Sequence, residues 1–182
     1  MRRLEDMTLE ELWQLFPIIL TAPDSRWKEW ASQEISNLQS ILGDLISQLN
    51  HIGSTAIKGI WAKPIIDLLL ETDKTGNFPL LRNLLTSAGY ICMKERESRL
   101  DFNKGYTPVG FAEKVFHIHV RLTGDNDEIY FRDYLNSHSD VAKDYEELKI
   151  SLWKQYEHNR DGYTDAKTDF ITHITTIAKQ TE

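Results

Sequence analysis

One segment, residues 64–70, constrains the fold most, because it is apolar at almost every position and carries a single carboxylate, Asp67. A continuous apolar run of this length is typical of a strand inside a sheet that helices cover. An ionisable side chain is costly to bury among apolar neighbours, so Asp67 is expected to point out of that core. The segment therefore predicts a covered sheet with an acid on its open side.

Other segments supply the remaining strands of this sheet. In the segment 115–122, His117 and His119 alternate with apolar residues, and alternate side chains of a strand point to the same face. The two histidines are therefore expected on one face. Further strands are predicted at 45–52, 91–97 and 99–103, the last two as a hairpin, followed by a loop rich in turn formers at 105–110.

Helical periodicity dominates both ends of the chain. Apolar residues recur every three or four positions from Asp24 to Leu42, which predicts a long amphipathic helix with Trp27 and Trp30 in the core. Thr8 begins a shorter helix through a capping box. Later helices are predicted at 77–88, 128–137, 141–156 and 163–179. The pattern predicts an α/β (α+β) fold, with a mixed sheet flanked by helices and a helical C-terminal third.

Composition narrows the class of protein. The 182 residues contain no repeat or linker and predict one domain, residues 1–182. A net charge of −7 disfavours nucleic acid as a partner. No secretion signal is visible, and the longest apolar stretch, 15–20, is too short to span a membrane. A single cysteine excludes an intramolecular disulfide and fits a reducing compartment, so a cytoplasmic location is expected.

The most informative motif connects the first two strands. Gly53 and Ser54 end one strand, and Thr55 follows. A glycine lets backbone amides approach an anion closely, and the two hydroxyls add donors, so the turn could hold a phosphate group. The alternative is that Gly-Ser is a plain turn, as most such dipeptides are.

Twelve residues separate Ser54 from Asp67, a spacing that resembles the signature of the nucleotidyltransferase superfamily. In that signature, Gly-Ser precedes a strand whose alternating carboxylates bind magnesium. More narrowly, the chain resembles the GrpB family in four ordered motifs. They read HIGSTAIKGIWAKPIIDLL, HIHV, FRDYLNSHSDVAKDYEELK and YTDAKTDFI. The resemblance implies a nucleotidyltransferase-like mixed sheet, and it implies no particular reaction, because none is established across the GrpB family.

The metal-ligating residues depart from that signature. Two-metal transfer needs carboxylates packed together, yet Leu69 occupies the alternate position after Asp67, and Glu71 lies roughly 13 Å along the strand. His117 and His119 could complete a three-ligand site with Asp67. A divalent cation (Mg, Mn or Zn) is therefore a candidate cofactor. Histidine ligands suit zinc, manganese or iron better than magnesium. The alternative is that the histidines are polar-face residues without a metal.

Basic residues could neutralise phosphate in the same place. Lys63, Arg132 and Lys167 are the candidates, and each lies inside one of the GrpB-like motifs. For Lys58 and Lys149, which lie in mixed-charge sequence, a solvated surface position is at least as good an interpretation.

Three functions fit these residues. One is a metal-assisted nucleotidyl or phosphoryl transferase, in which Asp67 is essential to catalysis. The second is a non-catalytic module that binds a nucleotide or another phosphorylated small molecule, because the partner carboxylate is missing at Leu69. The third is a protein–protein adaptor that uses the helical C-terminal third.

Overall fold

Five strands form one mixed sheet in the computed structural model, which describes residues 3–73 and 76–181. The strand order is β1-β2-β5-β4-β3. β2 runs parallel to β5, and the other neighbouring pairs are antiparallel. The strands are β1 (Gln48–Ile52), β2 (Ile66–Thr72), β3 (Ile91–Arg96), β4 (Arg99–Thr107) and β5 (Gly110–Leu122).

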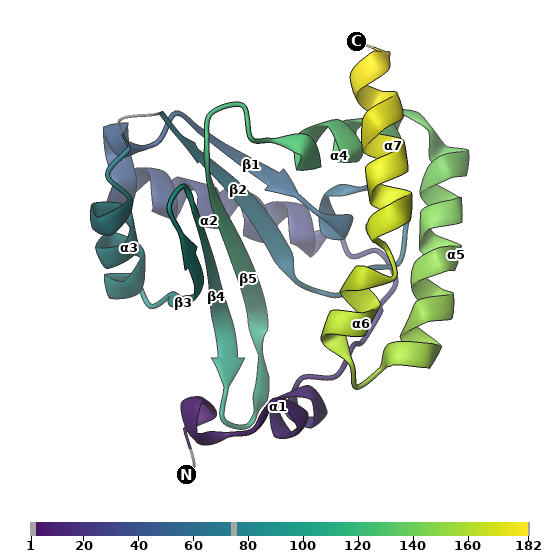
Figure 1. Ribbon diagram of the computed structural model, residues 1–182, viewed down its shortest axis with the longest axis horizontal. Coiled ribbons are helices and arrows are strands. Elements are labelled where there is room, and N and C mark those ends of the chain that lie inside the picture. The colour runs from purple at the N-terminus through teal and green to yellow at the C-terminus, as the bar shows by residue number, and fades with distance from the viewer. Residues whose placement is uncertain (1–2, 74–75, 182) are drawn as a thin grey trace.

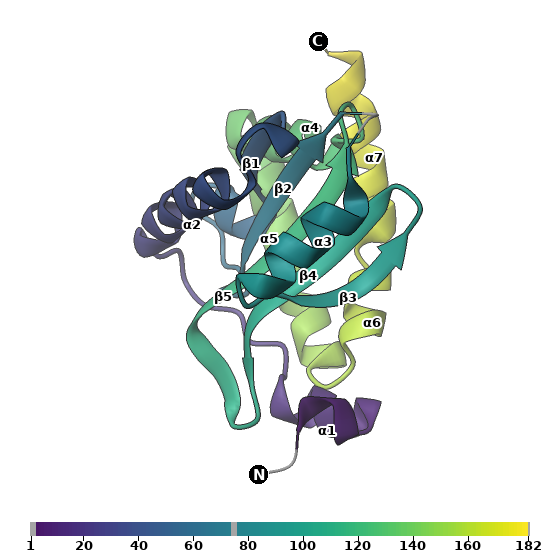
Figure 2. The same ribbon diagram turned by 90° about the vertical axis from the view of Figure 1, so that its left-hand side faces the viewer.

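Helices lie on both sides of the sheet (Figures 1 and 2). On one face lie α2 (Arg26–Leu42) and α3 (Phe78–Ser87). Beside the other face lie α4 (Asp127–Ser137), α5 (Ser139–Tyr156), α6 (Arg160–Asp165) and α7 (Thr168–Gln180). The remaining helical turns are α1 (Leu9–Leu15), η1 (Leu4–Asp6), η2 (Gly43–Leu45) and η3 (Ser54–Ala56). This arrangement confirms the predicted α/β class and the helical C-terminal third.

The main hydrophobic core lies between the sheet and the α2–α3 layer. Leu68 and Ile118 are fully buried there, against Trp27, Trp30 and Leu81 of the two helices. Alternate residues of β2 and β5 therefore point away from this core, and Asp67 and His117 are directly opposed in the parallel pairing. The register gives the open face its polar side chains.

The C-terminal helices bury most of their apolar residues elsewhere. α4, α5 and α7 pack around Ile57 and Ile60 of the β1–β2 connection, and α5 and α6 pack around Ile18 and Leu20 near the N-terminus. These contacts hold the helices beside the polar face of the sheet without filling the space over it. A cavity between sheet and helices follows from this packing.

Two local predictions from the sequence are confirmed. Thr8 Oγ1 accepts a hydrogen bond from Glu11 N at 3.2 Å, and Glu11 Oε2 accepts one from Thr8 N at 2.7 Å, which completes the capping box. Trp27 and Trp30 are 4% and 8% exposed and belong to the core. The sequence therefore predicted correctly both the helix cap at Thr8 and the buried face of α2.

The predicted loop at 105–110 is wrong, because β4 and β5 extend through most of it and pair as far as Thr107 and Gly110. Gly105 lies within β4 at a register shift, with φ of +92°. A Cβ at this position would lie 2.3 Å from the Lys114 carbonyl oxygen, so glycine here serves a bulge in a strand.

The single helix predicted at 163–179 is also wrong. The structure has a short helix, α6, that begins at Arg160, and a separate helix, α7, that begins at Thr168. Lys167 N donates to Thr164 O, a tighter reach than the α-helical pattern, where the first helix ends. Tyr163 and Phe170 are seven positions apart, a spacing that fits one continuous helix as well as two, so the periodicity could not reveal the break.

Among the helices in residues 3–73 and 76–181, none combines the length and the apolar character that crossing a membrane requires.

Candidate functional site

Asp67, His117 and His119 meet on the open face of the sheet. Asp67 Oδ1 lies 3.1 Å from His117 Nδ1 and 3.6 Å from His119 Nε2. One ligand atom from each residue lies within 4.8 Å of the others, a spacing that could hold a metal ion. The three side chains remain between 17% and 27% exposed, so they are accessible from the cavity. The predicted common orientation of the two histidines is confirmed.

A second row of side chains holds the outer nitrogens of these histidines. His119 Nδ1 donates to Asp101 Oδ1 at 2.9 Å, and that carboxylate also accepts from Arg121 Nη2 at 2.7 Å. His117 Nε2 lies 2.8 Å from the Tyr106 hydroxyl, which accepts from Arg160 Nη2 at 2.9 Å. Both imidazole rings are therefore fixed from β4, the strand next to β5.

These contacts shift the pKa of each group. Burial favours the neutral acid, but hydrogen bonds from His117 and His119 outweigh it and hold the pKa of Asp67 well below its usual range. Burial lowers the pKa of His117 against the attraction of Asp67. Burial also opposes a charge on His119, but hydrogen bonds to Asp101 and Asp67 prevail and raise its pKa to about 9. In the metal-free protein, His119 is therefore an imidazolium between two carboxylates.

The turn after β1 comes very close to Asp67. Gly53 has φ of +71° and ψ of −173°, and a Cβ there would lie 2.5 Å from Asp67 Oδ2. Only glycine satisfies both the backbone conformation and this close approach. The next residue, Ser54, faces the cavity, as does Tyr145 of α5. The turn thus brings a hydroxyl beside the acid.

Two predicted phosphate ligands lie outside the cavity lining. The Thr55 hydroxyl donates to Ile65 O at 3.1 Å and lies 2.9 Å from His51 Nε2. Arg132 donates from Nη1 to His51 O at 2.8 Å and pairs through Nε with Asp133 at 2.7 Å. Both side chains therefore hold the connection between β1, β2 and α4 in place.

Lysines from the facing elements form the opposite wall of the site. Lys63 precedes β2, Lys149 is on α5, and Lys167 is at the start of α7. Lys63 Nζ and Lys167 Nζ lie 5.3 Å and 4.3 Å from the centroid of the Tyr163 ring. Lys149 Nζ donates to Trp61 O and lies 4.8 Å from the Tyr145 ring centroid. In the described part of the chain, these amines form no ion pair with a carboxylate.

Burial disfavours positive charge on these amines. It lowers the pKa of Lys63 to about 7, helped by repulsion from Lys167 and Arg160. It lowers the pKa of Lys149 to about 7, helped by Lys167, and the pKa of Lys167 to about 8. Partly desolvated cations without a counter-ion gain most from an anion that enters the cavity.

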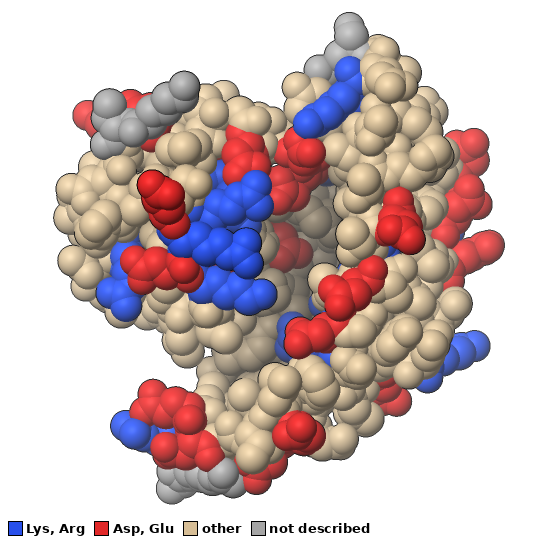
Figure 3. All heavy atoms as spheres, in the orientation of Figure 1, with Lys and Arg blue, Asp and Glu red and all other residues tan. Residues whose placement is uncertain are grey.

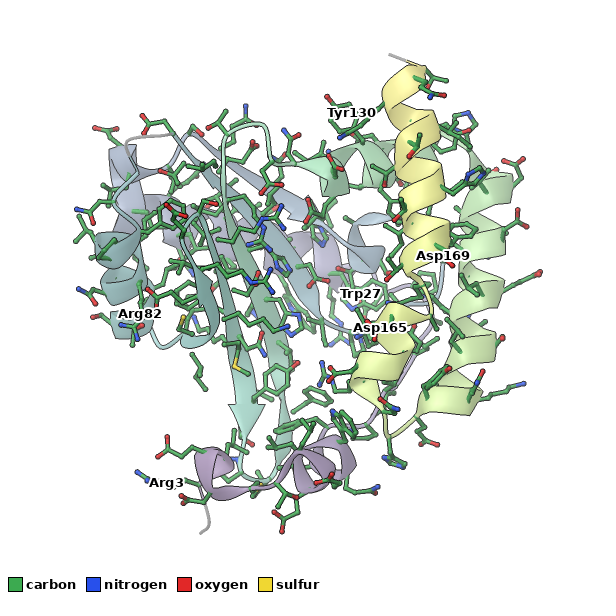
Figure 4. All side chains as sticks on the ribbon, viewed as in Figure 1. Arg3, Trp27, Arg82, Tyr130, Asp165 and Asp169 are labelled. Carbon is green, nitrogen blue, oxygen red and sulfur yellow. The ribbon has the colours of Figure 1, made fainter. Side chains whose placement is uncertain are left out.

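The two walls enclose a cavity of about 580 Å³. Figure 3 shows it as a groove between the sheet and the C-terminal helices, and polar side chains project into this region in Figure 4. Its volume lies within the range of pockets that bind small molecules. Besides Ser54, Tyr145 and Tyr163, the apolar and hydroxyl-bearing part of the lining comes from Ile52, Ile65, Phe131, Ile171, Thr164, Thr172, Thr175 and Thr176.

The structure does not provide a pair of magnesium sites built from carboxylates. Leu69, at the alternate position after Asp67, is fully buried. Glu71 is 1% exposed, and its Oε1 accepts from Gly124 N at 2.9 Å and from Asn126 Nδ2 at 3.3 Å. Glu71 therefore anchors the turn after β5, and among the described residues the ligand cluster at Asp67 contains no second carboxylate.

The structure thus brings together most of the predicted site residues: Gly53, Ser54, Lys63, Asp67, His117, His119 and Lys167. From the sequence, a solvated surface position was at least as good an interpretation for Lys149 as a place in the site. In the structure this side chain is 1% exposed and lines the cavity. Sequence reasoning missed the contacts of Asp101, Tyr106 and Arg160. The alternation of β4 could have placed Asp101 on the face of the histidines, whereas no local pattern connects Arg160 to Tyr106.

The sheet and its flanking helices define an α/β fold of the nucleotidyltransferase-like type. The chain resembles the Cid1 poly(U) polymerase, H336N mutant bound to MgATP, with a TM-score of 0.51 over 81% of this chain and 47% of that chain. Sequence identity is 12%, so this likeness shows the fold alone.

The chain belongs to the GrpB family, because the family model described as GrpB protein matches residues 17–176. It is 36% identical to the glutamate-rich protein GrpB of Alkalihalophilus pseudofirmus, over 86% of this chain and 93% of that protein. The crystal structure of GrpB from Enterococcus faecalis gives a TM-score of 0.78 at 28% identity, covering 90% of this chain and 98% of that chain. The chain spans only 63% of the length of a 32% identical UPF0157 protein from Pseudomonas aeruginosa.

Proposed function

We propose that the cavity binds a nucleotide or a similar phosphorylated small molecule and, with the help of a divalent cation, transfers a nucleotidyl or phosphoryl group from it to a hydroxyl acceptor or water, with release of pyrophosphate or the diphosphate. One observation carries the proposal: Asp67, His117 and His119 face Lys63, Lys149 and Lys167 across a single cavity. Cation ligands on one wall and unpaired ammonium groups on the other suit a substrate with several phosphate oxygens.

The lysine wall binds the phosphates in this proposal. Lys63, Lys149 and Lys167 donate to non-bridging oxygens, and the incoming anion returns their pKa values toward the ordinary range by supplying a counter-charge. The Ser54 hydroxyl adds a donor beside Asp67. Thr55 and Arg132 contribute indirectly, by fixing the turn that presents Ser54.

Asp67, His117 and His119 would hold the cation, which when bound supplies positive charge to the phosphate oxygens of the substrate. Asp67 is the essential carboxylate, since it contacts both histidines and the Gly53 turn. The remaining length of the cavity, with Phe131, Ile171 and threonine hydroxyls, offers apolar and hydrogen-bonding surface to a nucleoside. The MgATP bound to the similarly folded Cid1 polymerase makes ATP a sensible first probe.

A second candidate function is binding without turnover. It is favoured by the buried Leu69, which occupies the place of the second carboxylate that two-metal transfer uses. A module of this kind keeps the lysine wall and a single cation site and releases its ligand unchanged.

The test combines calorimetry and product detection on the purified chain. ATP, GTP, CTP and UTP, each with Mn²⁺, Mg²⁺ or Zn²⁺, are titrated, and pyrophosphate and phosphate release are measured in parallel. We expect saturable binding of at least one nucleotide, weakened about tenfold or more in Lys167→Met, because one charge-assisted contact is lost. Release of product is expected to disappear in Asp67→Asn.

Matched controls use exposed residues of α5. Lys154→Met and Asp144→Asn remove the same charges away from the cavity, and both are expected to behave as the wild type. Binding without any released product would select the second candidate. Absence of heat with every nucleotide, or equal affinities of Lys167→Met and Lys154→Met, would rule out this use of the cavity.

A further inference from the structure

We infer that Asp67, His117 and His119 form a site for one four-coordinate transition-metal ion of the zinc class, and that Asp101 and Tyr106 are positioning residues that orient its two histidines. The inference deepens the proposed function, because it names the kind of cation and the residues that present its ligands. It contrasts with the pair of cations, held by packed carboxylates, that two-metal transfer uses.

The spacing of the ligand atoms supports a tetrahedral ion. Two ligands about 2.0–2.1 Å from a tetrahedral zinc ion lie roughly 3.3 Å apart. Asp67 Oδ1 lies 3.1 Å from His117 Nδ1 and 3.6 Å from His119 Nε2, which brackets that value. The two imidazole nitrogens lie within 4.8 Å of each other, so they need to approach by at most about 1.5 Å.

The surrounding hydrogen bonds support histidine ligation. His119 Nδ1 donates to Asp101, so once an ion displaces the proton of Nε2, the lone pair of Nε2 points toward Asp67 and the ion. Asp101 is itself held by Arg121, a side chain 7% exposed. A carboxylate on the far nitrogen of a ligating histidine is the usual outer partner at zinc sites, where it fixes the tautomer and ring orientation.

Tyr106 performs the same task for His117. Its hydroxyl oxygen lies 2.8 Å from His117 Nε2, and the two rings stack with centroids 5.8 Å apart. Arg160 donates to this oxygen at 2.9 Å and thereby fixes the tyrosine. When Nε2 carries its proton and donates to Tyr106, the lone pair of Nδ1 faces Asp67 and is free to bind an ion.

The donor set selects the ion. Magnesium prefers six oxygen ligands, whereas one carboxylate with two imidazoles suits zinc, cobalt or manganese. Because all three side chains line the cavity, a fourth position faces the space where a phosphate oxygen or water would enter. Three protein ligands and one open position are the arrangement of a catalytic zinc site, in contrast to a closed structural one.

The test measures metal binding without any nucleotide. The full chain is stripped with a chelator and titrated with Zn²⁺ and Co²⁺ against a chromogenic competitor, and with Mg²⁺ by calorimetry. We expect one Zn²⁺ or Co²⁺ per chain, bound at least 100-fold more tightly than Mg²⁺. The Co²⁺ protein should show the intense visible absorption of four-coordinate cobalt. Asp67→Asn and His119→Ala should lose that spectrum.

The positioning residues have a distinct signature. Asp101→Asn and Tyr106→Phe keep all three ligands, so each should retain one Co²⁺ per chain, with roughly 10- to 100-fold weaker affinity and an altered spectrum. Asp125→Asn removes a carboxylate that pairs with Arg99 on β4, and Tyr130→Phe removes a hydroxyl on α4; both should match the wild type. Circular dichroism of each metal-free variant confirms that it is folded.

Three results would overturn the inference. They are comparable affinities for Zn²⁺ and Mg²⁺, a wild-type Co²⁺ spectrum in His119→Ala, and wild-type Co²⁺ affinity in both Asp101→Asn and Tyr106→Phe. Metal binding without nucleotide binding would sustain this inference and refute the proposed function. Nucleotide binding that is unaffected by removal of the metal and by His119→Ala would refute this inference and would leave only the nucleotide-binding part of the proposed function standing.

Discussion

At the scale of single residues, Gly53 shows how tightly the site is constrained. Its φ of +71° is rarely adopted by other residues, and a Cβ would lie 2.5 Å from Asp67 Oδ2. We therefore predict that Gly53→Ala lowers the free energy of unfolding by about 2–3 kcal/mol, from backbone strain together with the clash. It should also displace Asp67 and weaken Co²⁺ binding. Chemical denaturation and the cobalt titration measure the two effects.

Gly59 provides the matched control for backbone strain. Its φ is +73°, and a Cβ would meet no atom within 4 Å. Gly59→Ala should therefore lose about 1–2 kcal/mol of stability while binding Co²⁺ as the wild type does. If Gly53→Ala and Gly59→Ala have the same metal affinity, the close approach of Gly53 to Asp67 is unimportant for the site.

Lys149 makes stability depend on pH in a distinctive direction. Burial of its ammonium, with repulsion from Lys167, lowers its pKa to about 7, from 10.5 in the unfolded chain. Between these values the unfolded chain binds a proton that the folded chain does not, so stability rises with pH. We predict that Lys149→Met flattens this rise between pH 7.5 and 9.5, by up to about 1.4 kcal/mol per pH unit.

Denaturant midpoints measured across this pH range test the prediction. The pH range ends below 10 because burial raises the pKa values of Tyr145 and Tyr163 in the folded protein. Above pH 10 these tyrosines ionise more readily in the unfolded chain, which lowers stability. Lys154→Met, on the exposed side of α5, should keep the wild-type slope. Identical slopes for Lys149→Met and the wild type would mean that Lys149 stays charged in the folded protein.

Some residues of the site were predictable from the sequence, and the others depend on tertiary contacts. Asp67, His117 and His119 were predictable, because strand alternation and an acid in an apolar run are local signals. Lys149 was not, since its burial depends on how α5 packs beside Trp61, far away in the sequence. Arg160 reaches Tyr106 across 54 positions, and no periodicity encodes such a contact.

At the scale of elements, Glu34 ties α2 to the sheet. This side chain is 6% exposed, and its Oε1 accepts from the Tyr90 hydroxyl and from Lys104 Nζ, the latter at 2.9 Å. Asn37 donates to its Oε2 at 3.2 Å. We predict that Glu34→Ala lowers the free energy of unfolding by roughly 3 kcal/mol, because it leaves the Tyr90 hydroxyl buried without an acceptor.

A pH series separates the charge of Glu34 from its hydrogen bonds. Burial would raise the pKa of Glu34, but hydrogen bonds from Tyr90, Lys104 and Asn37 lower it below 4.5. Its contribution is therefore present above pH 4.5 and is lost as the pH falls further. Glu147→Ala, on the exposed side of α5, should change stability by less than about 0.5 kcal/mol. Equal stability of the two variants would contradict the role of Glu34.

Elements with uninterrupted periodicity were predicted well, and irregular ones were not. α2 and β2 were predictable from their apolar patterns, because the apolar residues of both elements pack in one core. The bulge at Gly105 and the break between α6 and α7 interrupt elements without interrupting their apolar spacing. Such interruptions depend on the backbone contacts of neighbouring elements, which a local pattern does not record.

At the scale of the whole molecule, the site lies between two layers that have separate cores. The sheet packs on α2 and α3, whereas α4 to α7 pack around the β1–β2 connection and the segment near Ile18. The cavity is therefore the place where the layers face each other without a shared apolar core (Figure 3). A ligand that contacts both walls would couple their motions, since opening of either layer would break its contacts.

We accordingly predict that ATP with Mn²⁺ slows amide hydrogen exchange in both β2 and α7, while α3 and β3, remote from the cavity, keep their exchange rates. Mass action adds about 2.7 kcal/mol of stability at a ligand concentration 100 times Kd, which corresponds to roughly 5–10 °C in Tm for a chain of this size. Lys167→Met at the same ATP concentration should lose about half of this stabilisation, because a tenfold weaker affinity leaves about 1.4 kcal/mol, and its protection of α7 should fall as well. Lys154→Met should keep them. Protection that appears in β2 alone would show that the ligand contacts the sheet without reaching the helices, and the coupling of the two layers would then be wrong.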